Sequence, residues 1–382
     1  MKCETFRFDE VTINFDRKRI PLSAKQRSKR QGNYRYYGAQ GVIDYVDNYI
    51  FDGTYLLIAE DGENLKSRKQ NISQIAKGKF WVNNHAHIVQ TNERCDLQYL
   101  HYLINSMDLS GYITGSAQPK LSQANLNAVA LHLPSIDEQK KIVAILGVLD
   151  EKIELNNKIN ENLERQTQAI YHKRFETVDI DKLPTGWRVV ALGDVAIISK
   201  KSFNPAKEPE IMLEHYSIPA FDESHFPVFE LSTAIKSNKF IVDDDCFMIS
   251  KLNPTTKRIW KPYCLTENAV CSTEFIVYKA KDSTITNFLY SVIDSACFSD
   301  FMCSHVTGST GSRQRTTPSD TLSFEFVFPS EDEIKRFQSL VSPMYAQMRS
   351  NAIENDRLKQ FRSNLLPKLM SGEIDVRDVL KL

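Results

Sequence analysis

Two long stretches of the chain place hydrophobic residues at the alternating three- and four-residue steps of a heptad helix. In residues 134–175, one row runs through Leu149 and Asn156 and the other through Ile153 and Asn160. The same rows return after Pro329, again with two Asn positions. This pattern predicts two helices with a/d seams. Because a buried Asn at a seam needs a polar partner and so fixes register, we expect the two helices to pack together. The residues predicted to pair are Leu149, Ile153, Asn156, Asn160, Leu163, Met344, Met348, Asn351, Asn355 and Leu358.

Both helices begin with a capping box, Ser135-x-x-Glu138 and Ser330-x-x-Glu333, in which the Ser hydroxyl and the Glu carboxylate satisfy free backbone N–H groups. Gly147 in the first copy and Ser342-Pro343 in the second predict a break, since Gly weakens a helix and Pro favours its first turn. Each copy is therefore predicted to be a short helix followed by a long one. The long helix of the first copy would run from Val148 to about Arg174 and span roughly 40 Å.

Outside these two helical stretches, the sequence predicts two regions that mix strands and short helices. Residues 1–133 and 177–328 each contain short runs rich in β-branched and aromatic residues, which are typical of strands. Each has one predicted helix, at Asp96–Met107 and at Thr286–Phe298. Each then passes a small polar loop, at 114–119 and at 307–315, before a final strand. The order of α/β domain, helix, α/β domain, helix indicates an internal repeat, with residues 177–186 as the linker. The predicted strand runs are 42–51, 54–61, 79–90, 130–134, 188–198, 239–250, 269–280 and 323–329.

Composition sets the class of protein. With 382 residues and 42% hydrophobic content, the chain can bury more than one core. Its 48 basic and 48 acidic residues cancel, so only local clusters of charge can indicate nucleic-acid binding. The seven cysteines form no CxxC pair, and no apolar run approaches the roughly 18 residues of a membrane span. A reduced, soluble, cytoplasmic protein is expected.

One segment carries the strongest signal for nucleic-acid binding. Residues 17–43, the basic segment, hold eight Lys and Arg and no acidic residue, together with Tyr34, Tyr36 and Tyr37. Clustered Lys and Arg neutralise phosphates, and Arg can reach base edges. The alternative is a solvated surface loop.

Weaker signals follow in the second domain and in the two polar loops, whose alternative is a tight connection into the last strand. Lys251, Lys257, Arg258 and Lys261 surround Trp260. The loops carry small side chains and free N–H groups that suit phosphate contact. The full set of predicted DNA contacts is Lys25, Arg27, Lys29, Arg30, Tyr34, Arg35, Tyr36, Ser116, Gln118, Lys120, Lys251, Lys257, Arg258, Lys261, Ser309, Arg313 and Arg315.

No catalytic motif is present. An amino-methyltransferase needs an Asn- or Asp-Pro-Pro-aromatic tetrapeptide, and neither Asn204-Pro205 nor Asn253-Pro254 continues in that way. His85 and His87 are two apart on a predicted strand, so they would share a face. No third ligand stands at a useful spacing, and two ordinary strand histidines are favoured over a metal pair. We expect a chain that is not an enzyme alone and holds no catalytic residue, metal or cofactor.

Several of these motifs resemble a known family. The residues are PSIDEQKKI before the first heptad helix, the TGS-x-Q loop, LPTGWRVVALGDV at 183–195, STEFIV in a late strand, and LLPKLMSGEI near the end. Together they resemble the specificity (S) subunit of type I restriction-modification enzymes. The resemblance covers most of the chain. One departure is that no LPxGW motif precedes Phe8-Asp9-Glu10-Val11, the counterpart of LGDV.

The resemblance implies an α+β fold with two α/β target recognition domains separated by two long antiparallel coiled-coil helices, in a pseudo-twofold internal repeat. The expected segments are 1–133, target recognition domain 1; 134–176, central helical region for spacing and partner docking; 177–328, target recognition domain 2; and 329–382, distal helical region.

The function that the resemblance implies is sequence-specific binding of a bipartite double-stranded DNA target, which directs adenine methylation and cleavage by partner subunits. Those partners are two modification (methyltransferase) subunits and restriction (helicase-nuclease) subunits of the prokaryotic cytoplasm. S-adenosylmethionine, ATP and Mg are expected on the partners. The length of the helices would set the spacing of the half-sites. The alternative is a coiled-coil scaffold whose heads bind proteins.

Overall fold

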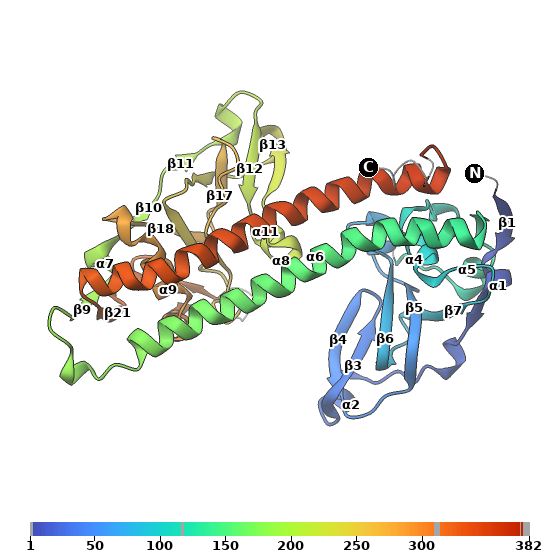
Figure 1. Ribbon diagram of the computed structural model, residues 1–382, viewed down its shortest axis with the longest axis horizontal. Helices are drawn as coiled ribbons and strands as arrows, with labels where there is room; N and C mark the ends of the chain where they lie inside the picture. The colour runs from blue at the N-terminus through green and yellow to red at the C-terminus, as the bar shows by residue number, and fades with distance from the viewer. Residues whose placement is uncertain (1–2, 116–117, 309–313, 375, 377–382) are drawn as a thin grey trace. The chain divides into compact units, whose positions relative to one another are not determined.

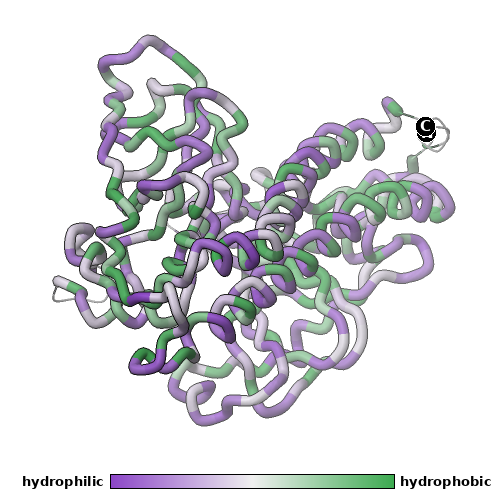
Figure 2. Tube along the Cα trace, turned by 60° about the vertical axis from the view of Figure 1, so that its left-hand side comes forward, coloured by the Kyte–Doolittle hydropathy of each residue, from purple (hydrophilic) through white to green (hydrophobic). Residues whose placement is uncertain are grey.

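The computed structural model describes residues 3–115, 118–308, 314–374 and 376. It divides into two compact units, with Met1–Lys152 and Leu358–Leu382 in unit 1 and Ile153–Arg357 in unit 2. Two long helices, α6 (Ile136–Tyr171) and α11 (Glu331–Ser371), contribute residues to both units (Figure 1). Along both helices hydrophobic and hydrophilic residues alternate (Figure 2), as an amphipathic pattern requires.

Unit 1 contains a six-stranded sheet of order β2-β7-β5-β6-β3-β4 and a two-stranded ribbon, β1-β8. Its elements are β1 (Glu4–Arg7), α1 (Phe8–Val11), β2 (Thr12–Asn14), α2 (Ala24–Arg27), β3 (Gln31–Gly38), β4 (Gly41–Val46), β5 (Phe51–Ala59), α3 (Asn64–Ser67), β6 (Ser73–Val82), β7 (Ala86–Thr91), α4 (Leu97–Ser106), α5 (Gln123–Asn127) and β8 (Ala130–Leu133).

Unit 2 contains a four-stranded sheet of order β10-β18-β15-β16, a five-stranded sheet of order β11-β14-β17-β12-β13, and the ribbons β21-β9 and β19-β20. Its elements are β9 (Arg188–Ala191), α7 (Leu192–Val195), β10 (Ala196–Ser199), β11 (Ser202–Phe203), β12 (Met212–Tyr216), α8 (Ile218–Ser224), β13 (Val228–Leu231), β14 (Lys239–Ile241), β15 (Cys246–Ser250), β16 (Ile259–Trp260), β17 (Ala269–Ser272), β18 (Phe275–Ala280), α9 (Thr286–Asp294), α10 (Ala296–Ser304), β19 (Val306–Thr307), β20 (Arg315–Thr316) and β21 (Glu325–Phe328).

Both units are built on the same core of antiparallel strands. The ribbon β1-β8 corresponds to β9-β21, and the three strands β2-β7-β5 correspond to β10-β18-β15. Helix α4 precedes the last strand in unit 1, as α9 does in unit 2. Beyond this core the units differ, since unit 1 extends its sheet with β6, β3 and β4 whereas unit 2 adds a separate five-stranded sheet. The predicted internal repeat is therefore a repeat of the core.

The first strand of unit 1 forms although the LPxGW motif is missing. At the start of α1, Phe8 N–H donates to the Val129 carbonyl at 2.9 Å, and at the start of α7, Leu192 N–H donates to Phe324 at 2.8 Å. Ladder hydrogen bonds to the strand before the long helix thus hold β1 and β9 in the same way. These main-chain bonds do not depend on the residues of the missing motif.

Each core is closed by hydrophobic side chains from the long helices. In unit 1, Leu100 of α4 is fully buried with Ile142 and Leu146 of α6 and with Leu369 of α11. In unit 2, Phe288 of α9 packs with residues of both helices, among them Phe337. Each such side chain contributes about 1.5–3 kcal/mol by leaving water. The predicted α+β class with two packed long helices is confirmed.

The predicted break in each long helix is wrong. Helix α6 runs through Gly147 without interruption, and α11 runs through Pro343. Pro343 and Ser339, whose carbonyl the proline ring displaces, both lie on the exposed side, so water can satisfy that carbonyl. On the opposite side Phe337 and Val341 are fully buried, and this packing outweighs the local preference.

Several predicted elements are subdivided. The single strands predicted at 42–51, 79–90, 239–250 and 269–280 each contain a turn between two strands, and 188–198 contains the one-turn helix α7. The helix predicted at Thr286–Phe298 is two helices, because Ser295 ends α9 and caps α10 by accepting a hydrogen bond from Phe298 N–H. Runs of β-branched residues do not mark such turns.

We predict that His101 in α4 makes the stability of unit 1 sensitive to acid. Burial lowers the pKa of His101 from 6.5 to about 4, and its Nδ1 accepts hydrogen bonds from Ser73 and Asn105. The unfolded chain therefore binds a proton more readily than the folded chain. The contribution is intact above about pH 6.5 and is lost as the pH falls to about 4, by at most about 3 kcal/mol.

Urea unfolding of the wild type and of His101→Asn at pH 7 and pH 4.5 checks this prediction. The variant should lose less of its free energy of unfolding between the two pH values. An equal loss in both proteins would contradict it.

Candidate nucleic-acid interface

The basic segment folds as a short helix followed by an edge hairpin. Ser23 caps α2 through a capping box with Gln26, and the chain then enters β3 at Gln31. Trp81 of β6 donates its indole N–H to the Ile20 carbonyl at 2.6 Å, and Leu22 N–H donates to the hydroxyl of Tyr36 at 2.9 Å. Side chains of the sheet therefore hold the main chain of this segment in place.

Two of the predicted DNA contacts in this segment are neutralised by acidic neighbours on β4 and just beyond it. Arg27 donates to Asp44 at 2.8 Å and lies over the Tyr36 ring, 5.1 Å from its centroid. Arg30 pairs with Asp47 at 2.8 Å and lies over Trp81. The hydrogen bond from Arg27 holds the pKa of Asp44 below its usual value, so that carboxylate stays charged. The local charge of the segment is lower than its sequence indicates.

Other residues of the segment remain accessible. Lys25, Lys29 and Arg35 are exposed, and within the described ranges neither Lys25 nor Lys29 forms an ion pair. Tyr36, in contrast, is fully buried in a small core with Leu22 and Trp81. Tyr36 is one of the predicted DNA contacts, but its ring is not accessible here and supports Arg27 from inside.

Tyr49 and Lys79 also lie on this surface, although neither is among the contacts predicted from the sequence. The ring of Tyr34 lies 5.1 Å from that of Tyr49, and the ammonium of Lys79 lies 4.7 Å above Tyr49. Sheet pairing of β6 with β3 brings Lys79 to this place. The alternation Lys77-Gly78-Lys79 puts two lysines on one face of a strand, which is the signal that could have indicated it.

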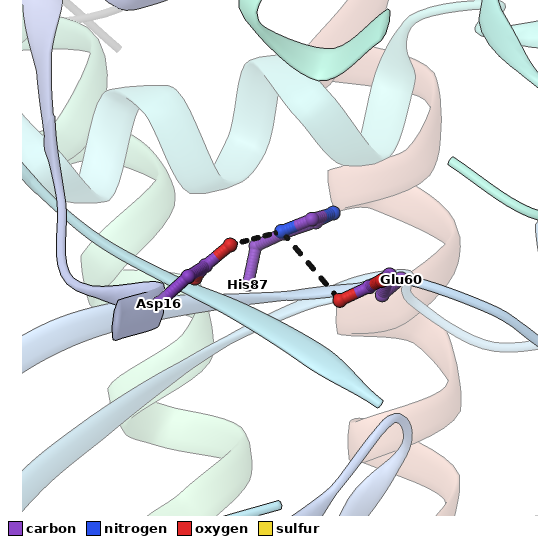
Figure 3. Close-up of side chains that lie close together, drawn as sticks. All are labelled: Asp16, Glu60 and His87. Atoms are coloured by element: carbon purple, nitrogen blue, oxygen red, sulfur yellow. Dashed lines mark hydrogen bonds and ion pairs between the residues drawn. The ribbon is translucent and has the colours of Figure 1, made fainter. Parts of the chain in front are cut away.

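A largely buried polar cluster includes Asp16, the residue directly before the basic segment (Figure 3). It consists of Asp16, Glu60 and His87, whose ligand-type atoms lie within 4.8 Å of one another. His87 Nδ1 is 2.6 Å from Asp16, and Arg19 donates to Glu60 at 2.7 Å. The guanidinium of Arg19 is also 3.5 Å from Asp16, so it supplies positive charge to both carboxylates.

Burial by itself raises the pKa of both acids in this cluster. For Asp16 the hydrogen bond and charge of His87 outweigh burial, and for Glu60 the contacts with Arg19 and His87 do so. The pKa of each is lowered as a result, and both carboxylates stay ionised.

The two histidines do not share a strand face as predicted. His85 lies in the turn before β7 and pairs with Asp61 at 2.8 Å, whereas His87 lies in β7 and is buried. The acidic neighbours of His87 come from positions far away in the chain, so spacing alone could not have revealed them.

The two polar loops occupy equivalent places in the two units. Lys120 forms β-bridges to Asp61 and Thr114 in unit 1, and Arg315 forms a bridge to Leu252 in unit 2. Each cation then pairs with an acid, Lys120 with Glu60 at 3.3 Å and Arg315 with Glu274 at 3.0 Å. Gln118 is exposed, and Ser116, Ser309 and Arg313 lie outside the described residues.

The cluster predicted around Trp260 is mostly engaged inside unit 2. Lys257 pairs with Asp294, whose pKa is raised by burial, and Arg258 makes two bonds to Asp222. Lys261 donates to Asn287, and burial lowers its pKa. Trp260 belongs to the core, and Lys251 is half-buried. Among the contacts predicted in unit 2, Lys251 and the loop residue Arg315 therefore remain as candidates, and both are partly exposed.

Within unit 2 the long helices pair through their asparagines, in crossed order. Asn156 donates to Asn355 at 2.9 Å and to Glu354, and Asn351 donates to Asn160 at 2.8 Å. The position on α11 falls by four as that on α6 rises by four, so the segments are antiparallel. Asn156, Asn351 and Asn355 are at most 5% exposed.

The other predicted seam residues are buried to different degrees. Ile153 is buried, and Leu149, Leu163, Met344, Met348 and Leu358 are partly buried. In unit 1 the seam continues through an ion pair of Asp150 with Arg362, and Tyr102 donates to the same carboxylate at 2.7 Å. The first capping box forms around Ser135, but in the second copy Glu333 binds Arg174 instead.

Comparison with known proteins agrees with this architecture. Residues 2–165 match the family described as Type I restriction modification DNA specificity domain, which gives the class of protein. The specificity subunit of the type I restriction enzyme MjaIX from Methanocaldococcus jannaschii is 27% identical, over 92% of this chain and 86% of that protein. That of HindI from Haemophilus influenzae is 23% identical, over 88% and 87%.

Another Haemophilus influenzae relative is 36% identical over 37% of this chain, and the match spans 36% of that protein's length. The fold is also similar to the crystal structure of the type I system S subunit from M. genitalium. That similarity has a TM-score of 0.59 at 14% sequence identity and covers 97% of this chain and 96% of that one.

Over most of its length the chain is thus similar to type I restriction-modification specificity (S) subunits. Such a subunit is the non-catalytic member of its system and determines the DNA target. Among the helices described, none is both long and apolar enough to cross a membrane.

We predict that the crossed asparagines act as coupled pairs. Asn156→Ala leaves the Asn355 carbonyl oxygen buried without its donor, which should lower the free energy of unfolding by about 1–3 kcal/mol. The double variant Asn156→Leu/Asn355→Leu replaces both partners and should recover most of that loss, since apolar groups fit a seam.

Urea unfolding measures both changes, with exposed Asn162→Ala in the same helix as the control. A double variant that is less stable than Asn156→Ala would contradict the coupling.

Proposed function

We propose that this chain recognises a bipartite double-stranded DNA target, with one half-site for each unit's head, for a type I restriction-modification system. The head of unit 1 is residues 1–133 and that of unit 2 is residues 177–328. Residues 134–176 and 329–382 would set the spacing of the half-sites and dock the partners. The observation that carries this proposal is the duplicated core. Each head has its own copy of the same core strands, and each adds different elements to that core, as two different specificities require.

The partners that fit this role are two modification subunits and restriction subunits. Adenine methylation and cleavage would take place on those partners, together with S-adenosylmethionine, ATP and Mg. Support comes from the family match and from a sequence without the tetrapeptide that holds a flipped adenine. This chain's own residues would bind phosphates, contact base edges and position the duplex.

On the first head, the proposed contact surface consists of the accessible residues of the basic segment and of the neighbouring strand and loop. Lysine neutralises phosphates, and tyrosine and arginine add stacking and hydrogen bonds at the bases. These residues are Lys25, Lys29, Tyr34, Arg35, Lys79, Gln118 and Lys120. On the second head, Lys251 and Arg315 take this role. Arg27 and Arg30 would hold the surface in shape through Asp44 and Asp47.

The proposed function predicts one bipartite motif. The full chain, purified with its modification subunit, should select from random duplex DNA a single motif of two specified half-sites and an unspecified spacer. Its affinity should exceed that for scrambled DNA by at least about 10³-fold at physiological salt. Selection of no motif would contradict the proposal and favour a scaffold whose heads bind proteins.

The accessible lysines predict a change in salt dependence. Lys25→Ala/Lys29→Ala should weaken binding to all sequences alike and reduce the slope of log K against log [salt] by about 1 to 2, since each phosphate contact contributes about 0.9.

Arg30→Ala/Asp47→Ala serves as the matched control, because it removes one charge of each sign from the same region. Its slope should stay close to that of the wild type. If the lysine variant keeps the wild-type slope, these lysines do not contact phosphates.

A further inference from the structure

The cluster of Asp16, Glu60 and His87 with Arg19, here called the joint, contains a buried histidine. His87 is 1% exposed, and both ring nitrogens face hydrogen-bond acceptors. Nδ1 lies 2.6 Å from the Asp16 carboxylate, and Nε2 lies 2.8 Å from the Leu121 carbonyl. The ring can donate to both acceptors at once only when each nitrogen carries a proton. The Asp16 carboxylate at 2.6 Å and the Glu60 carboxylate at 3.9 Å both face Nδ1 (Figure 3).

The shared core does not require this histidine. In unit 1 His87 stands opposite Ile58 in the β5-β7 ladder, and in unit 2 Ile276 stands opposite Ile249 in the corresponding β15-β18 ladder. Ile276 is also 1% exposed. An apolar residue thus fills the same position in the second head. A buried charged network usually gives no more stability than well-packed apolar residues, so the joint calls for another explanation.

The joint connects two segments that lie far apart in the sequence. Arg19 lies near the start of the basic segment. It donates hydrogen bonds to the Ala86 carbonyl at 2.9 Å and to Glu60. Glu60 also pairs with Lys120 of the polar loop, and His87 holds the carbonyl of Leu121 directly after that loop. The basic segment and the end of loop 114–120, at Lys120, are therefore fixed to one buried point.

We propose that the joint positions the basic segment and loop 114–120 of the first head for recognition of the first DNA half-site, with Asp16, His87 and Arg19 as positioning residues. This inference rests on the proposed function. The joint holds the main chain at both segments without contacting DNA. Its loss should change which bases are accepted, while the general attraction to phosphates remains.

The test is His87→Ile in the full chain, purified with its modification subunit. The ratio of affinities for the selected motif and for a single mismatch in the first half-site should fall by about tenfold or more, which is the worth of one well-formed base contact. The same ratio for the second half-site should stay at its wild-type value. The salt slope should also stay unchanged, because no residue of the proposed phosphate-contacting surface is removed.

Two further variants separate positioning from simple loss of stability. Leu100→Ala opens a cavity in the same head's core at a residue outside the joint, and should destabilise the head while leaving both mismatch ratios intact. Asp16→Asn can still accept from Ile88 N–H and can donate to His87 Nδ1 when that nitrogen carries no proton, so it keeps these hydrogen bonds without the charge of Asp16. It should retain most of the first half-site ratio.

A wild-type ratio in His87→Ile, or an equal loss of the first half-site ratio in Leu100→Ala, would overturn the inference. A wild type that selects no bipartite motif would overturn the proposed function itself. The two failures are thus distinguishable.

Discussion

A buried amide at a helix seam must find a partner, and this constraint organises the pairing of the two long helices. Asn156 and Asn160 sit where a fully apolar seam would bind more strongly, yet each meets an Asn of the other helix. In the antiparallel arrangement the pairs are crossed, so a shift of either helix by one turn would leave buried amides unpaired. Leucine alone would tolerate such a slip. The polar pairs exchange stability for a single register.

With the helices in one register, each head needs only a small common core to attach to them. The ribbon and the three antiparallel strands provide it, because main-chain hydrogen bonds and apolar contacts with the helices tolerate different side chains. Such a core can carry different additional strands without changing its attachment. His87 and Ile276 show how far this tolerance extends, since one position of the core holds a polar imidazole ring in one head and an aliphatic chain in the other.

Two groups can be distinguished among the basic residues that the structure describes in the heads, those paired with an acidic residue and those that are exposed without an ion pair. Arg27, Arg30, Lys257 and Arg258 all look like nucleic-acid contacts in the sequence, and all are paired with Asp residues in the fold. Paired arginines lying over aromatic rings hold a surface in shape, whereas exposed lysines without an ion pair keep their charge available. The distinction matters for a chain of zero net charge, in which attraction to DNA depends on a few accessible cations.

The sequence by itself determined the two heptad helices, the first capping box, the Asn positions, the duplicated order of elements and the family resemblance, because these depend on local spacing and on residues close together in the chain. It did not determine the continuity of α11 at Pro343, where packing of the buried face outweighs a local preference. Nor did it show which cations are neutralised, because Asp44 and Asp47 meet Arg27 and Arg30 only through the β3-β4 pairing. The joint of Asp16, Glu60 and His87 is a tertiary feature in the same sense. Its members come from three separate segments, and only the folded sheet brings them together.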